Sequence, residues 1–252
     1  MTPPAAAPAP RGPVLAIETS WRIGSVALGV DGAVAARRLL TTPRAHSATL
    51  IAAIREVLEE EALHPADLAG IAIGSGPGSF TGVRIGAAAA KGFAATLEIP
   101  LYPTSTLRAA ACAEEILADA ADLPPEVRCG SGEPRVVGEG TQPEHRYVLL
   151  DARGGRVYGA GYDVGNAGRP VEVRAPHGGT ILDVVNARPA VGTVFVGDGA
   201  LAHESLLLAA GFEVRPAPAG VPLADAVYLC CPWEPVDAAA WEPSYIRQWR
   251  PG

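Results

Sequence analysis

The sequence has few aromatic residues, no excess of positive charge and no regularly spaced cysteines. Aromatic side chains make up 6% of the 252 residues, so the core has to be built mainly from alanine, valine, leucine and isoleucine. The formal net charge is −7. This charge argues against a protein that grips nucleic acid with its whole surface, because such binding depends on neutralising phosphates. A local basic patch is still compatible with it.

Other absences narrow the class of protein further. Cys112, Cys129, Cys230 and Cys231 show no C-x-x-C spacing, which favours small buried side chains over a metal site or a disulfide. No apolar run is long enough to span a membrane. The opening MTPPAAAPAP lacks the basic segment and apolar run of a signal peptide, and we expect residues 1–12 to form a flexible tail. These features together predict a cytoplasmic protein.

The order of elements in the first half is predicted to be β-β-β-α-β-α. A D-G turn between apolar runs indicates a hairpin, and apolar residues at helical spacing indicate helices. The predicted strands are VLAIETS, IGSVALGV, AVAARRLL and LAGIAIG, and the predicted helices are SATLIAAIREVLEE, with Ser47 as N-cap, and VRIGAAAAKGFAAT. Thr81 is predicted to cap the second helix.

The second half repeats this plan. YVLLDARGGRVYGAGYDV aligns with VLAIETSWRIGSVALGV and places Asp151 opposite Glu18, while TVFVGDGALAHESLLLAAG again reads strand, glycine loop, helix. Such a duplication points to two similar α/β lobes. We expect them at 13–105 and 106–252, the second with a long loop at about 119–145.

Three small-residue loops follow predicted strands: ETSWRIG, GSGPGSFTG and GDGA. Ligands of open α/β sheets bind beyond such strand ends, and helix N-termini there can receive an anion. The loops resemble those of the nucleotide cleft of actin, sugar kinases and heat-shock ATPases, but Glu18 stands where that cleft needs aspartate. Neither a Walker loop nor G-x-G-x-x-G spacing is present. Phosphate binding and a tight strand-to-helix connection both stay open, and the spacing favours the connection.

More specific motifs occur in order between Val14 and Arg247: VLAIETS, His46-Ser47, GSGPGSFTGVRIG, DARGGRVY, GDGA and EPSYIR. In these motifs the chain resembles the TsaB (YeaZ) family, a bacterial subunit of the tRNA threonylcarbamoyladenosine machinery. The resemblance implies a two-lobed actin-like (ASKHA, ribonuclease H-like) α/β fold, each lobe a mixed sheet flanked by helices. It also implies a non-catalytic subunit that binds the TsaD-type transferase, which modifies the adenosine just 3′ of the anticodon.

The sequence offers a check on this implied lack of catalysis. TsaD carries a His-x-x-x-His metal pair, and alignment puts Thr106 and Ala110 at the two positions. Neither side chain suits a transition metal. We therefore expect no catalytic residue and no metal in this chain, and no tight ATP binding by the chain alone, with ATP and metal on partner subunits. The chain departs from the family pattern in a longer 122–145 segment and a proline-broken stretch before EPSYIR.

The resemblance also selects candidate residues. The small-residue helix suits either close packing in its own lobe or an interface, and the resemblance favours an interface shared with the His46–Glu61 helix. The partner-binding candidates are His46, Leu50, Ile54, Gly76, Pro77, Gly78, Ser79, Phe80, Thr81, Gly82, Arg84, Ala88 and Ala95. The candidates for a vestigial cleft are Glu18, Thr19, Ser20, Asp151, Arg153, Gly197, Asp198 and Gly199.

Four residues keep two interpretations each. His46 could be a base or a ligand, but helix capping or a partner contact is favoured. Glu18 and Asp151 could form a catalytic carboxylate pair, but acids that hydrogen-bond loop amides are favoured. Lys91 could contact RNA, but a solvated lysine is favoured.

The expected partners are the TsaD-type transferase and the TsaE-type ATPase, with tRNA contacted indirectly, no membrane, and a possible homodimer when the chain is alone. The alternative function is an actin-fold small-molecule kinase or ATPase that uses the Gly74–Gly82 loop. A peptidase is a weaker alternative, because no histidine pair, Ser/His/Asp set or Cys/His set is apparent.

Overall fold

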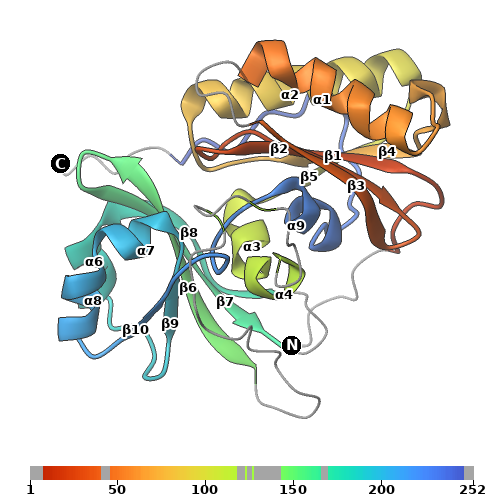
Figure 1. Cartoon of the computed structure of the whole chain (residues 1–252). Coiled ribbons are helices and arrows are strands. Elements are labelled where there is room, and N and C mark those ends of the chain that lie inside the picture. Colours follow the sequence, from red (N-terminus) through yellow and green to blue (C-terminus); the bar gives the residue numbers. More distant parts are fainter. Residues whose placement is uncertain are drawn as a thin grey trace. The chain divides into compact units, whose positions relative to one another are not determined.

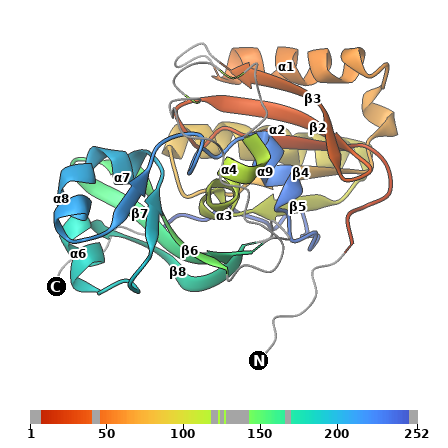
Figure 2. The same cartoon turned by 60° about the horizontal axis from the view of Figure 1, so that its bottom comes forward.

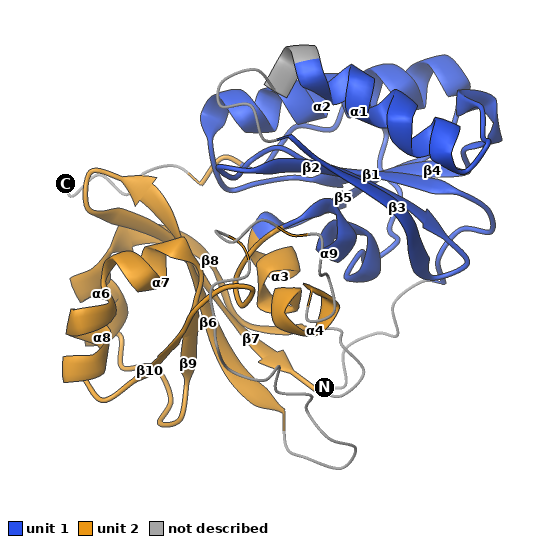
Figure 3. Cartoon of the chain, viewed as in Figure 1, with its two compact units in different colours: residues 1–106, 223–244 blue, residues 107–222, 245–252 orange. Residues whose placement is uncertain are grey.

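The computed structural model describes residues 8–40, 46–117, 123, 127, 143–165 and 170–246, with the backbone alone at 46–48. The chain divides into two compact units, residues 1–106 with 223–244, and residues 107–222 with 245–252 (Figure 3). The sequence predicted that everything after residue 105 belongs to the second lobe. The structure instead returns 223–244 to the first unit, because this segment buries apolar side chains against the first sheet.

The first unit is built on a five-stranded mixed sheet in the order β3-β2-β1-β4-β5. Central β1 pairs antiparallel with β2 and parallel with β4. All residues of β1 and β4 are buried, as expected for strands covered on both faces. The D-G turn closes the β2–β3 hairpin with positive φ at both residues, which confirms that prediction. The strands are β1 Val14–Glu18, β2 Gly24–Val30, β3 Ala33–Leu40, β4 Gly70–Gly74 and β5 Leu101–Thr104.

Helices cover both faces of this sheet. Helices α1 (His46–Glu60) and α2 (Phe80–Leu97) pack on one face, and α9 (Ala224–Leu229) packs on the other (Figure 1). A short 3-10 helix, Pro65–Asp67, precedes β4. On α1 the residues at helical spacing, among them Val57 and Leu58, point into the core, so the predicted amphipathic face is confirmed.

The second unit repeats the topology of the first. Its sheet has the order β8-β7-β6-β9-β10, with central β6 antiparallel to β7 and parallel to β9 (Figure 1). Figure 2 shows strands β6, β7 and β8 of this unit from another direction. Strand for strand this is the order of the first sheet, which confirms the duplication read from the sequence. The strands are β6 Glu144–Arg153, β7 Arg156–Val164, β8 Val171–Thr180, β9 Val194–Val196 and β10 Glu213–Arg215.

Alternate residues of β6 face different helices of the second unit. Tyr147 and Leu149 pack into a core with residues of α6, α7 and α8, whereas Arg146 bonds to residues of α3 and α4. Because side chains alternate along a strand, the two helix groups cover opposite faces of the sheet. The helices are α3 Thr106–Ala111, α4 Ala113–Leu117, α6 Ile181–Asn186, α7 Asp198–Ala202 and α8 Glu204–Ala209.

A buried charge network fixes α4 to the second sheet. Arg146 donates to Glu115 at 2.8 Å and to Glu144 at 2.6 Å, and Arg215 donates to Glu114 at 2.6 Å and to Glu144 at 2.9 Å. Burial alone would raise the pKa of Glu144, but the hydrogen bonds from Arg215 and Arg146 outweigh it and lower that pKa. Buried ion pairs persist only when their groups are matched in this way.

Several sequence expectations fall partly outside the described residues. Within the expected loop at 119–145, Leu123 and Val127 are buried. Strand β6 already begins at Glu144, so parts of this stretch pack against the fold. Residues 119–122, 124–126 and 128–142, which include Cys129, lie outside the described part of the chain, as do residues 1–7. The three described cysteines, Cys112, Cys230 and Cys231, are buried, as expected. Among the helices described, none has the length and apolar character needed to cross a membrane.

Candidate functional site

Glu18 lies at the carboxyl end of β1 and is fully buried. Its Oε1 accepts the Ser20 N–H at 2.5 Å, and its Oε2 accepts the Thr106 hydroxyl at 2.9 Å. Burial raises the pKa of this carboxyl, against the opposing effect of hydrogen bonds from Ser20 and Thr106. The carboxyl group therefore faces the chain's own loops and has no solvent-exposed surface.

Thr106 ties three segments of the first unit together. Its hydroxyl lies 2.9 Å from the Ser20 hydroxyl and accepts the Gly76 N–H at 3.2 Å, and its own N–H donates to the Gly76 carbonyl at 2.9 Å. The sequence analysis considered this residue only as a missing metal ligand. Here it joins the loop after β1, the glycine loop and the start of α3, while Ala110 is buried in the core.

The glycine loop, residues 74–82, packs directly on the loop after β1. The Ser79 N–H donates to the Ser20 carbonyl at 2.6 Å, and the Thr19 hydroxyl donates to the Gly82 carbonyl at 2.8 Å. A Cβ at Gly78 would overlap the Ser20 carbonyl oxygen, and one at Gly82 would overlap that of Thr19. The glycines thus make room for the neighbouring backbone, which supports the tight-connection interpretation of the loop.

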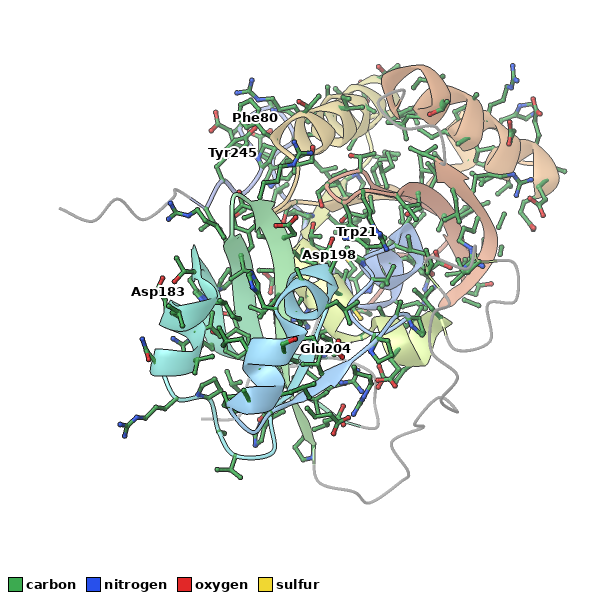
Figure 4. The ribbon with its side chains drawn as sticks, turned by 60° about the vertical axis from the view of Figure 1, so that its left-hand side comes forward. Trp21, Phe80, Asp183, Asp198, Glu204 and Tyr245 are labelled. Atoms are coloured by element: carbon green, nitrogen blue, oxygen red, sulfur yellow. The ribbon has the colours of Figure 1, made fainter. Side chains whose placement is uncertain are left out.

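Helix α2 begins earlier than the sequence predicted. Ser79 is its N-cap and accepts the Gly82 N–H at 3.3 Å, so the capping role predicted for Thr81 belongs to Ser79. Phe80 in the first turn is 56% exposed and extends outward (Figure 4). The Arg84 guanidinium lies 3.8 Å from the centre of its ring. An aromatic side chain and a cation therefore stack at the exposed start of this helix.

The small residues of α2 serve two faces. One face packs into the unit's own core through Gly82, Val83, Gly86, Ala87, Ala90 and Ala94. The other is exposed and includes Thr81, Arg84, Ala88, Gly92 and Ala95. The packing interpretation is therefore confirmed for the inner face. The interface interpretation stays a prediction for the exposed face, on which Ala88 and Ala95 lie.

Two partner-binding candidates on α1 need correction. Leu50 and Ile54 are 1% and 2% exposed and belong to the core of the first unit. The contact role came from the family resemblance, whereas their helical spacing, which predicted the helix, is the spacing that buries them against the sheet. Ile51, which the sequence analysis passed over, is the exposed apolar residue at 54%. His46 is the first residue of α1, and its side chain lies outside the described part of the chain.

The cleft candidates of the second unit hold local backbone in place. Asp151 accepts the Arg153 N–H at 2.8 Å, and Asp198 accepts the Asp151 N–H at 3.0 Å. Gly197 has φ +99°, and a Cβ there would overlap the Leu149 carbonyl oxygen. Glu18 and Asp151, at equivalent ends of β1 and β6, both accept the amide two residues on, as the favoured interpretation of these acids predicts.

Lys91 is not a solvated lysine. Its Nζ donates to the carbonyls of Ala239 and Trp241 at 3.1 and 2.9 Å. The sequence gave no signal for this contact, because the partners are about 150 residues away along the chain. In the described ranges, no group of three or more histidine, cysteine, aspartate or glutamate side chains is arranged to hold a metal ion.

Comparison with known proteins shows what this chain is similar to. The family model TsaD, described as tRNA N6-adenosine threonylcarbamoyltransferase, matches residues 40–153. The tRNA threonylcarbamoyladenosine biosynthesis protein TsaB of Escherichia coli is 42% identical over 94 residues, or 37% of this chain and 40% of that protein. The TsaB of Bacillus subtilis is 37% identical over 94 residues, or 37% of this chain and 41% of that protein.

The comparisons support the TsaB (YeaZ) family. The matched segment spans about 40% of the length of these TsaB relatives. YeaZ from Pseudomonas aeruginosa has a TM-score of 0.67 at 24% identity, covering 93% of this chain and 99% of that one. A Pseudomonas aeruginosa protein described as similar to peptidase YEAZ has a TM-score of 0.69 at 22% identity, covering 94% and 100%. These likenesses confirm the expected two-lobed α/β fold.

The buried carboxyl of Glu18 predicts an unusual pH dependence of stability. Because its folded-state pKa is raised above 4.5, the stability present below that pH is lost as the pH rises through the folded-state pKa. Glu18→Gln keeps an uncharged acceptor for the Ser20 N–H, and its amide N–H can donate to the Thr106 hydroxyl in place of the bond that Glu18 accepts. Its free energy of unfolding should therefore rise relative to the parent as the pH increases from about 4.5.

Urea unfolding over a pH series measures this difference, with the exposed Glu61→Gln as control. Glu18→Ala, which leaves Ser20 and Thr106 without their acceptor, should lose about 2–4 kcal/mol at low pH. This loss should shrink as the pH rises, because the parent is itself destabilised there. A Glu18→Gln variant that follows the parent at every pH would contradict the assignment.

Two glycines of α2 should respond in opposite ways to the same substitution. Gly82→Ala should destabilise the chain by about 1–3 kcal/mol, because the new methyl group would overlap the Thr19 carbonyl. Gly92→Ala meets nothing within 4 Å on the exposed face and should stabilise the helix by about 0.5–1 kcal/mol. Denaturant unfolding compares the two variants. Equal effects at both positions would show that the loop after β1 does not constrain Gly82.

Proposed function

We propose that this chain is a non-catalytic subunit in threonylcarbamoyladenosine modification of tRNA and that it binds a TsaD-type transferase. The observation that carries the proposal is the contact between the glycine loop and residues 18–20. Backbone and side-chain atoms of residues 18–20 pack directly on this loop and occupy the space next to its glycines. The names of the TsaB relatives support the process in which the subunit acts.

The exposed side of α2 is the surface proposed to bind this partner. We call Thr81, Arg84, Ala88, Gly92 and Ala95 the partner surface. Their mostly short side chains let a second helix approach closely, as good shape complementarity requires. Phe80, stacked on Arg84 at one end, provides the kind of exposed aromatic anchor that often dominates an interface. Ile51 extends the apolar area onto α1.

Further parts of the proposal follow from the same family. A TsaE-type ATPase joins the assembly, and tRNA is contacted through the transferase. ATP and a metal ion are carried by the partner subunits. The chain acts in the cytoplasm and can pair with a second copy through the partner surface when the transferase is absent.

Bulky substitutions on the partner surface test the main proposal. Ala88→Trp and Ala95→Trp should leave the fold intact, because both positions are exposed, and should weaken binding to the transferase by about 10- to 100-fold. Ala209→Trp on exposed α8 of the second unit is the matched control and should bind like the parent. Circular dichroism checks folding, and calorimetry measures affinity. Parent-like binding by both variants would remove α2 from the interface.

Nucleotide titration separates the proposal from the kinase or ATPase alternative. Isothermal titration of the isolated chain with ATP and Mg²⁺ should give no saturable heat at micromolar concentrations. The physical reason is that residues 18–20 fill the near side of the glycine loop. A known ATP-binding protein of the same fold class serves as positive control. Saturable one-to-one binding in the micromolar range would favour the alternative function.

A further inference from the structure

Residues 236–244, which we call the C-terminal strap, run from the edge of the first sheet to the glycine loop. At the sheet edge, the Val236 N–H donates to the Leu101 carbonyl at 3.0 Å, extending the sheet beyond β5. At the other end, the Ser244 N–H donates to the Ser75 carbonyl at 2.8 Å. The closing motif and the glycine motif, which the sequence analysis found as separate signatures, are therefore in direct contact.

Lys91 fastens the middle of the strap to α2. The Ala239 and Trp241 carbonyls that it bonds belong to a turn. Asp237 closes this turn by accepting the Trp241 N–H with its carbonyl at 2.8 Å and the Ala239 N–H with its carboxylate at 2.9 Å. Hydrogen bonds from an ammonium group are stronger than those between neutral groups. Trp241 and Ala238 also pack against the core of the unit.

The strap confines the glycine loop on the side away from β1. Gly76 has φ +89°, and a Cβ there would lie 3.0 Å from the Ser244 carbonyl oxygen. Residues 18–20 hold the same loop from the other side. The loop leads directly into Ser79 and Phe80, so its placement fixes the first turn of α2 and the start of the partner surface.

We propose that Lys91 is a positioning residue for partner binding. By fastening the strap, it holds the glycine loop and the first turn of α2 in the arrangement that the partner surface requires. Lys91 need not touch the partner for this effect. The inference rests on the proposed function. It assigns to the strap the role of holding the glycine loop and the first turn of α2 in place.

Hydrogen exchange and binding measured on the same variants test this role. Lys91→Met keeps the aliphatic stem and removes the ammonium group, whereas Lys91→Arg keeps a charged donor. Arg11→Met, which removes one positive charge from an exposed position of the same unit, is the control. Exchange is followed by mass spectrometry in residues 75–82 and 236–244, with β1 and β4 as the reference for intact folding. Affinity for the transferase is measured by calorimetry.

In Lys91→Met we expect exchange in both segments to quicken by about tenfold, and affinity for the transferase to fall by about tenfold. Protection of β1 and β4 should stay unchanged. Lys91→Arg should restore most of both properties, and Arg11→Met should match the parent. Unchanged exchange in Lys91→Met would overturn the inference, as would faster exchange with parent-like affinity.

Two further outcomes remain decisive. If Lys91→Met also loses protection in β1 and β4, Ser244→Pro tests the same link by removing the N–H that reaches Ser75. Parent-like exchange in residues 75–82 and parent-like affinity in that variant would overturn the inference. If the parent chain itself does not bind the transferase, the proposed function fails and the positioning role falls with it. The exchange data then still show whether Lys91 holds the loop.

Discussion

The close approach of residues 18–20 to the glycine loop is the constraint on which the first unit depends. Two backbones can lie this near only where side chains are missing, and Gly78 and Gly82 supply the space. The buried carboxyl of Glu18 satisfies the Ser20 amide and the Thr106 hydroxyl, which would otherwise be costly to bury. The loop after β1, the glycine loop and Thr106 are consequently joined by one network of hydrogen bonds.

The internal duplication shows how one topology can carry two different loop chemistries. In both units an acid at the end of the central strand accepts the amide two residues further along, Glu18 from Ser20 and Asp151 from Arg153. Glu18 is fully buried, whereas Asp151 is exposed beside a hairpin turn. The two acids differ in burial because different segments pack on them. In the first unit these are the glycine loop and the Thr106 hydroxyl, and in the second unit the shorter turn into α7.

Residues 18–20 pack on the glycine loop, whereas the outer side of α2 is exposed. The inner side of this helix accepts the sheet and the loop after β1, so its small residues are needed there for packing. The outer side of the helix also carries mostly small residues, and these are exposed and contribute nothing to the core. The C-terminal strap crosses the unit and contacts both α2 and the glycine loop, so a single segment links the edge of the sheet to the start of this surface.

Local patterns in the sequence determined the strands, the main helices, the D-G hairpin and the repeat, because each depends on the spacing of neighbouring residues. They also indicated that Glu18 and Asp151 bond to loop amides. Only the tertiary structure decided that Leu50 and Ile54 are buried while Ile51 is exposed, and which face of α2 is free. It also decided that Ser79 caps α2, that residues 223–244 return to the first unit, and that Lys91 bonds to the strap. Those contacts join residues far apart in the chain, and no local periodicity encodes which distant backbone will meet a given side chain.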